Sequence, residues 1–152
     1  MSRMLSSPIL LNNALSLGVH LVITIAAVVT AKYSQSTPGY TAVISEVAYN
    51  IILIIAASTA YIVCGFFLKP LDRHLFLSVA SIPILLVLVF LICSAFGAES
   101  GFYYFYANPL AASIIRLLRL SDVLNVILLL LSPLIPSLLV YTGMILRKCF
   151  GG

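Results

Sequence analysis

The residues of this chain that could do chemistry are four polar side chains inside apolar segments, namely His20, Thr24, Glu46 and Asn50. Polar and ionisable groups are costly inside a bilayer, so each is a functional hypothesis by default. At 1.5 Å per residue, His20 would lie roughly 16 Å, Asn50 roughly 12 Å and Glu46 roughly 6 Å from one membrane face. Glu46 and Asn50 share a helix face because they are one turn apart. We expect the four side chains to form one polar stripe between the first two helices.

Two interpretations of this polar stripe are open. As a functional site it would be a proton- or cation-linked pathway, with Glu46 as the titrating group and His20 as a relay. As a structural feature it would be a hydrogen-bond clamp between helices. This second interpretation is favoured, because one His and one Glu are a weak signal for a functional site. Two such groups are too few for a zinc site of ordinary coordination number, and the cysteines include no CxxC pair. The sequence therefore predicts neither a metal nor a cofactor.

The motifs of catalysis are missing from the sequence. His20 and His74 fall at different depths, so no nucleophile, base and orienting group come together. There is no glycine-rich phosphate loop and no cluster of acids or bases of the kind that membrane enzymes use on lipid phosphates. We therefore predict a non-enzymatic protein with no catalytic residues.

Composition places the chain among integral membrane proteins. Its 152 residues are 62% hydrophobic and 8% charged, whereas soluble domains carry about 25% charged residues. So few charges could not cover a soluble protein of this length, but lipid solvates an apolar surface. The net charge is +4, and the basic residues lie at the ends of apolar runs. This placement indicates that the basic residues set the orientation of the chain in the membrane, beside anionic lipid headgroups, and do not bind nucleic acid.

The apolar runs predict an all-α, four-helix membrane bundle in a single domain over residues 1–152. Each run is long enough to cross about 30 Å of hydrocarbon; the runs are 9–31, 42–68, 75–96 and 122–146. A cleaved signal peptide is disfavoured, because the first run is too long and is interrupted by polar residues. The predicted loops are 32–41 and 69–74, and the second is so short that it makes the second and third spans antiparallel neighbours. Lys and Arg number five on the side of both termini against three on the other, which favours cytoplasmic termini.

Small residues and prolines predict how the spans pack and bend. Small residues at four-residue steps let helices approach closely in lipid; they are Ala14, Gly18, Ala26 and Thr30 in the first span, and Ala56, Ala60 and Cys64 in the second. Proline removes a backbone donor and commonly kinks a lipid-embedded helix. We expect a kink at Pro83 and a marked one where Pro133 and Pro136 stand three residues apart.

The longest connection, 97–122, has signals of its own. Its five consecutive aromatics, Phe102 to Tyr106, are typical of a membrane interface. Asn108 is a good N-cap and Pro109 a good first residue for a helix over 109–120. That helix would be roughly 18 Å long, too short to span. Its arginines lie largely opposite its leucines, so we predict an interfacial amphipathic helix, with a re-entrant element or a partner-docking surface as the alternatives.

Two functions remain open. The first is a non-enzymatic multi-pass membrane protein that acts through protein or lipid contacts, as an accessory, assembly or immunity-type subunit. Its candidate contact residues lie in the long connection and are Tyr103, Tyr104, Tyr106, Arg116 and Arg119. The second is a small transporter or channel that uses the polar stripe and is oligomeric, because four spans enclose little water. The expected partners are membrane lipid and either a second copy of the chain or another membrane protein. No nucleic-acid partner is expected.

Overall fold

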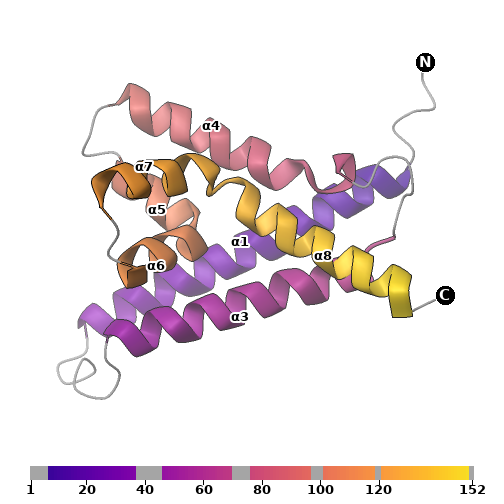
Figure 1. Ribbon diagram of the computed structural model, residues 1–152, viewed down its shortest axis with the longest axis horizontal. Helices are drawn as coiled ribbons and strands as arrows, with labels where there is room; N and C mark the ends of the chain where they lie inside the picture. Colours follow the sequence, from indigo (N-terminus) through magenta and orange to yellow (C-terminus); the bar gives the residue numbers. More distant parts are fainter. Residues whose placement is uncertain (1–6, 37–45, 70–75, 97–100, 119–120, 151–152) are drawn as a thin grey trace.

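The structure is all-helical wherever it describes the chain. A computed structural model describes residues 7–36, 46–69, 76–96, 101–118 and 121–150. The elements in order are α1 (Ser7–Ser36), α3 (Glu46–Phe67), the 3-10 turn η1 (Leu77–Val79), α4 (Ser81–Ala95), α5 (Gly101–Ala107), α6 (Pro109–Leu118), α7 (Asp122–Leu131) and α8 (Leu134–Phe150) (Figure 1). These ranges contain no strand, and the all-α prediction is confirmed.

Two helices are long and apolar enough to cross a membrane, over Pro8–Lys32 and Glu46–Phe67. The bent pair α7–α8 is a third candidate if it forms one span. α4 has 15 residues, which corresponds to about 22 Å and is short of a full span. The described helices therefore indicate a membrane protein with two or three candidate spans.

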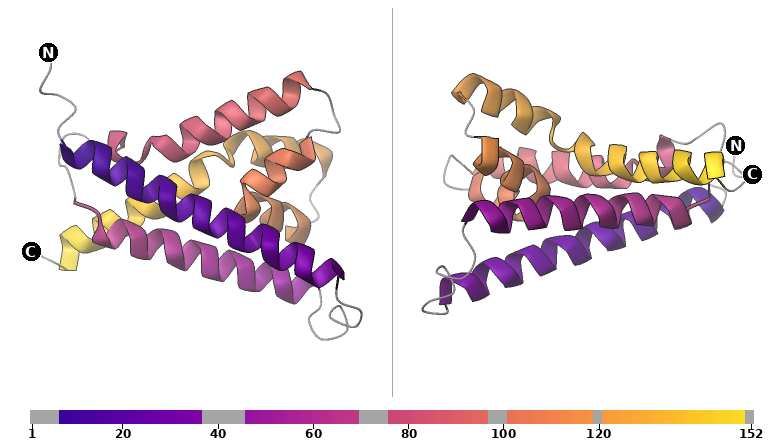
Figure 2. Two further views of the ribbon diagram at one scale, coloured as in Figure 1. Left: turned by 180° about the vertical axis from the view of Figure 1, so that it is seen from behind. Right: turned by 60° about the horizontal axis from the view of Figure 1, so that its bottom comes forward.

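The longer helices α1, α3, α4 and α8 run along the molecule in alternating directions (Figure 1). α1 and α3 are antiparallel neighbours, and α8 crosses α3 in the most extensive contact of the fold (Figures 1 and 2). η1 and α4 pack against α1. α5 and α6 form a corner that contacts α1 and α4 through α5, and α1 and α3 through α6. The α5–α6 corner is thus enclosed by other helices.

The crossing of α3 and α8 is centred on two glycines. A Cβ added to Gly65 would overlap the carbonyl oxygen of Val140, and one added to Gly143 would overlap that of Ile62. The two backbones are therefore in direct contact, which only glycine permits at these positions. Small residues play this role at helix interfaces in lipid, where close packing replaces the hydrophobic effect.

α1 packs against α3 as expected, but most of the small residues of α1 turn outward. They are exposed, and a Cβ on Gly18 would meet no atom within 4 Å. The exception is Thr30, whose Oγ1 lies 3.1 Å from the Tyr49 hydroxyl oxygen, and on α3 Ala60 and Cys64 are half-buried beside α1. The buried face of α1 carries polar residues instead, at four-residue steps: Asn12, Ser16 and His20. These side chains need hydrogen-bond partners that lipid cannot supply. Their need for partners decides which face of α1 points inward.

Proline positions explain the bend between α7 and α8. The two helices meet at 52° around Ser132 and Pro133, which confirms the predicted kink. Pro136 lies in the first turn of α8, where no backbone donor is needed. Pro83 likewise lies in the first turn of α4. It begins a helix rather than kinking one, so the kink expected there is absent.

The interior gathers large side chains from most of the described helices. Among the fully buried ones are Tyr61, Ile82, Leu86, Leu110, Val140 and Met144. The outer faces of α1, α3, α4 and α7 carry many exposed Leu, Ile and Val side chains. In water these would form large apolar patches, whereas lipid solvates them.

Candidate functional site

His20 is buried between α1 and α3. Its Nδ1 lies 2.7 Å from the hydroxyl oxygen of Tyr61, and the two rings stack with centroids 6.1 Å apart. The imidazole also lies close to the backbone of Ala107. The hydroxyl of Thr24 donates to the Ala107 carbonyl at 3.5 Å. His20 and Thr24 therefore attach α1 both to α3 and to the end of α5.

Glu46 and Asn50 do not join this cluster. The α1–α3 register pairs Asn12 with the Lys69 backbone, His20 with Tyr61, and Thr30 with Tyr49. Asn50 precedes Tyr61 by about three helical turns, or about 16 Å. The expected single stripe is thus divided, because α1 continues to Ser36 rather than ending at residue 31, and α3 begins at Glu46 rather than at residue 42.

The separated pair has a different environment. Glu46 is exposed in the first turn of α3. Asn50 is buried, and its Nδ2 donates to the backbone carbonyl of Glu46 at 2.9 Å. Among the described residues, the Oδ1 of Asn50 has no hydrogen-bond partner. Asn50 therefore leaves one buried acceptor unpaired and makes no link to His20.

Two asparagines near the start of α1 make contacts that the sequence reasoning missed. Asn12 Nδ2 donates to the Lys69 carbonyl at 2.9 Å. Asn13 Nδ2 donates to the Leu77 carbonyl at 2.8 Å, and its Oδ1 accepts from the backbone N–H of Ser81 at 2.9 Å. Together they fix the end of α3 and the start of α4 to α1. The only signal for this was two adjacent amides in an apolar run.

A second buried polar cluster joins the α5–α6 corner to the α7–α8 bend. The hydroxyl oxygen of Tyr104 lies 2.6 Å from Ser132 Oγ, and Asn108 Nδ2 donates to the Ser132 carbonyl at 3.2 Å. In a regular helix that carbonyl would accept from residue 136, but Pro136 has no N–H. The Ile135 N–H reaches that carbonyl at 3.2 Å, and Asn108 supplies a second donor to it. Its Oδ1 accepts from the Ala111 N–H at 3.3 Å, which confirms it as the N-cap of α6.

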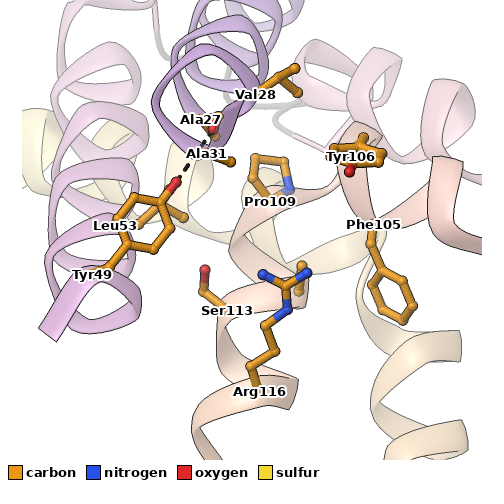
Figure 3. A pocket seen from close by; sticks show the side chains of 11 residues that line it. Ala27, Val28, Ala31, Tyr49, Leu53, Phe105, Tyr106, Pro109, Ser113 and Arg116 are labelled. Carbon is orange, nitrogen blue, oxygen red and sulfur yellow. Dashed lines mark hydrogen bonds between the residues drawn. The ribbon is translucent and has the colours of Figure 1, made fainter. Parts of the chain in front are cut away.

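A small pocket lies where α6 meets α1 and α3 (Figure 3). Its volume is about 80 Å³, well below the roughly 300–1,000 Å³ of sites for drug-sized molecules. Ala27 and Ala31 line it from α1, Tyr49 from α3, and Ser113 and Arg116 from α6. An apolar wall thus faces hydroxyl groups and a guanidinium.

The predicted contact residues fall into three groups. Tyr104 is 1% exposed and inside the second cluster, so it cannot contact a partner at the surface. Tyr106 and Arg116 are exposed and line the pocket. The side chain of Tyr103 and the whole of Arg119 lie outside the described residues.

No metal centre emerges from the described part of the chain. There, no three His, Cys, Asp or Glu side chains are placed to hold an ion together, and Cys64, Cys93 and Cys149 form no disulfide with one another. No protein-family model, no curated protein sequence and no solved structure matches the chain. The function must therefore be inferred from the chemistry of the polar clusters and the pocket.

Proposed function

We propose that this chain is a small multi-pass membrane protein that acts through contacts with protein or lipid, as an accessory, assembly or immunity-type subunit, and not as an enzyme. The observation that carries the proposal is a contrast between polar groups. His20, Tyr61 and Asn108 are buried and bonded to one another or to other helices. Arg116 is exposed beside a pocket and has no hydrogen bond or ion pair with any described residue. Bonded groups hold the helices together, whereas the guanidinium is available to a partner.

The proposed topology has four passes, with η1–α4 and the bent α7–α8 completing the bundle begun by α1 and α3. The start of α1 and the end of α8 lie at one end of the molecule, since Asn12 contacts Lys69 and Arg147 donates to the Leu68 carbonyl at 2.8 Å. The excess of Lys and Arg at that end supports placing it on the cytoplasmic side.

In this topology the α5–α6 corner is a re-entrant element. The first half of α6, from Pro109 to Ser113, is buried, which supports insertion over a helix lying flat in the interface. A break in a helix at membrane depth requires that its freed backbone groups find partners inside the protein. Asn108 and Ser132 meet that requirement at the two breaks.

A second candidate function, a small oligomeric transporter or channel, is favoured by one observation. The two helix breaks meet beside His20, and discontinuous helices that meet near midplane form the substrate sites of many transporters. This candidate requires flux that depends on His20. Against it, Glu46 stands about 22 Å along α3 from the His20–Tyr61 contact, and the described acidic residues, Glu46 and Asp122, are both exposed, whereas His20 is buried.

Native mass spectrometry of the full chain, extracted from membranes in mild detergent, tests the proposal. We expect the chain to retain phospholipid, a second copy or another membrane protein. His20→Ala should retain the same bound species, because His20 lies in the interior. A wild-type chain that leaves the membrane as a bare monomer under all mild detergents would contradict the proposal.

A further inference from the structure

The pocket beside Arg116 has the chemistry of an anion site. Arg116 is exposed and makes no hydrogen bond or ion pair with the described residues. Ser113 lies one turn earlier on the same helix and brings its hydroxyl to the same pocket (Figure 3). A guanidinium and a hydroxyl are donors that phosphate oxygens accept, with the guanidinium able to bind two oxygens at once.

The apolar wall of the pocket restricts what the anion can be attached to. Ala27, Ala31 and Leu53 face the arginine across the pocket, and the α1 and α3 surfaces beyond them carry exposed Val29, Ile51 and Ile52. An inorganic ion would gain nothing from these carbons. A ligand with a charged head and an apolar body would bury surface against them, at roughly 25 cal/mol for each Å².

The position of the pocket along α1 and α3 also selects the ligand. The candidate spans end at Lys32 and begin at Glu46, so Ala31 and Tyr49 stand within a turn of the span ends. This is the level of lipid headgroups. Lys32 and Glu46 are both exposed there, and with Arg116 the described charges around the pocket leave an excess of one positive charge.

From these features we propose that the pocket binds the headgroup phosphate of an anionic phospholipid. Arg116 and Ser113 contact the phosphate, and the acyl chains lie along the apolar surfaces of α1 and α3. The volume of about 80 Å³ is of the size of a phosphate group, so the rest of the lipid would lie outside the pocket. The inference rests on the proposed function and names the lipid class that this surface of the protein recognises.

The test measures which lipid the full chain retains from an equimolar mixture of phosphatidylglycerol and phosphatidylcholine in nanodiscs. We expect the wild-type chain to enrich phosphatidylglycerol about tenfold, because phosphatidylcholine carries the same phosphate but brings a choline cation beside Arg116. Arg116→Ala should reduce the enrichment to near one, and Arg116→Lys should keep part of it. Lys148→Ala removes the same charge at the other end of the molecule and should leave the enrichment unchanged.

Two further arms separate the alternatives. Ala31→Leu narrows the pocket without changing the charge and should lower the enrichment even if Arg116→Ala fails to fold. Glycerol 3-phosphate in millimolar excess should not displace the lipid, and displacement would assign the site to a free phosphate instead. Equal losses in Arg116→Ala and Lys148→Ala, or none in either, would overturn this site. If the wild-type chain and Arg116→Ala retain the same lipid to the same extent, the site is overturned but the proposed function is not. If the wild-type chain retains no lipid or partner, the proposed function is overturned.

Discussion

Gly65 of α3 and Gly143 of α8 meet backbone to backbone, and neither position has room for a Cβ atom. A Cβ at Gly65 would lie 3.0 Å from the Cα of Gly143 and would also overlap the Val140 carbonyl. Because backbone cannot yield as a side chain can, the two helices would have to separate. This contact sets the distance between α3 and α8, the most extensively packed helix pair.

The first prediction is that Gly65→Ala lowers the free energy of unfolding by about 1–3 kcal/mol, the usual cost of overpacking. Gly18→Ala is the matched control, because a Cβ there meets nothing within 4 Å. It should be neutral, or stabilising by up to about 1 kcal/mol through helix propensity. Unfolding by SDS titration in mixed micelles, followed by circular dichroism, measures both. Equal stabilities for the two variants would contradict the crossing.

A second prediction concerns the interior pair His20 and Tyr61. Tyr61→Phe leaves His20 Nδ1 buried without its partner at 2.7 Å, so stability should fall by about 1–3 kcal/mol. In a double-mutant cycle with His20→Phe, the double mutant should lose less stability than the sum of the losses of the two single mutants. Tyr106→Phe, at a side chain 48% exposed, should change stability by less than about 0.5 kcal/mol. Additive losses would show that the pair does not interact.

The third prediction tests the link between the α5–α6 corner and the α7–α8 bend. Asn108→Ala removes both the cap of α6 and one of two donors to the Ser132 carbonyl, so it should cost about 2 kcal/mol. Ser94→Ala is the control, because Ser94 is exposed and its hydroxyl donates to the Phe90 carbonyl of its own helix, at 2.8 Å. The same SDS titration compares them. A loss for Asn108→Ala no larger than that for Ser94→Ala would remove Asn108 from this role.

The fourth prediction compares two buried asparagines. Asn12 has partners on both amide atoms, whereas Asn50 Oδ1 has none. Asn12→Leu should therefore destabilise by about 1–3 kcal/mol, and Asn50→Leu should be neutral or stabilising. Thermal melting in detergent measures the Tm of both variants. A drop in Tm for Asn50→Leu as large as that for Asn12→Leu would show that Asn50 Oδ1 is paired.

Local sequence signals predicted several features that the structure has. The apolar runs indicated helices, Asn108-Pro109 marked the start of α6, and Pro133 marked the bend. Each of these depends on the backbone chemistry of neighbouring residues, which a single sequence displays directly.

Contacts between distant segments could not be predicted in the same way. The partner of His20 depends on where α1 and α3 end, and errors of a few residues at both helix ends moved the expected partner from Tyr61 to Asn50. The meeting of Gly65 with Gly143 has no local signal beyond an isolated glycine in each apolar helix. The burial of Tyr104 likewise depends on Ser132, which is 28 residues away in the chain.

Flux through the reconstituted chain tests most directly whether the interior holds the helices together or conducts. The full chain in proteoliposomes is compared with protein-free liposomes for proton flux, with a pH-sensitive dye, and for potassium flux. Our account predicts that wild type, His20→Ala and Glu46→Gln all match the protein-free liposomes while circular dichroism shows them folded. Flux above that level in the wild type, lost in His20→Ala, would contradict it.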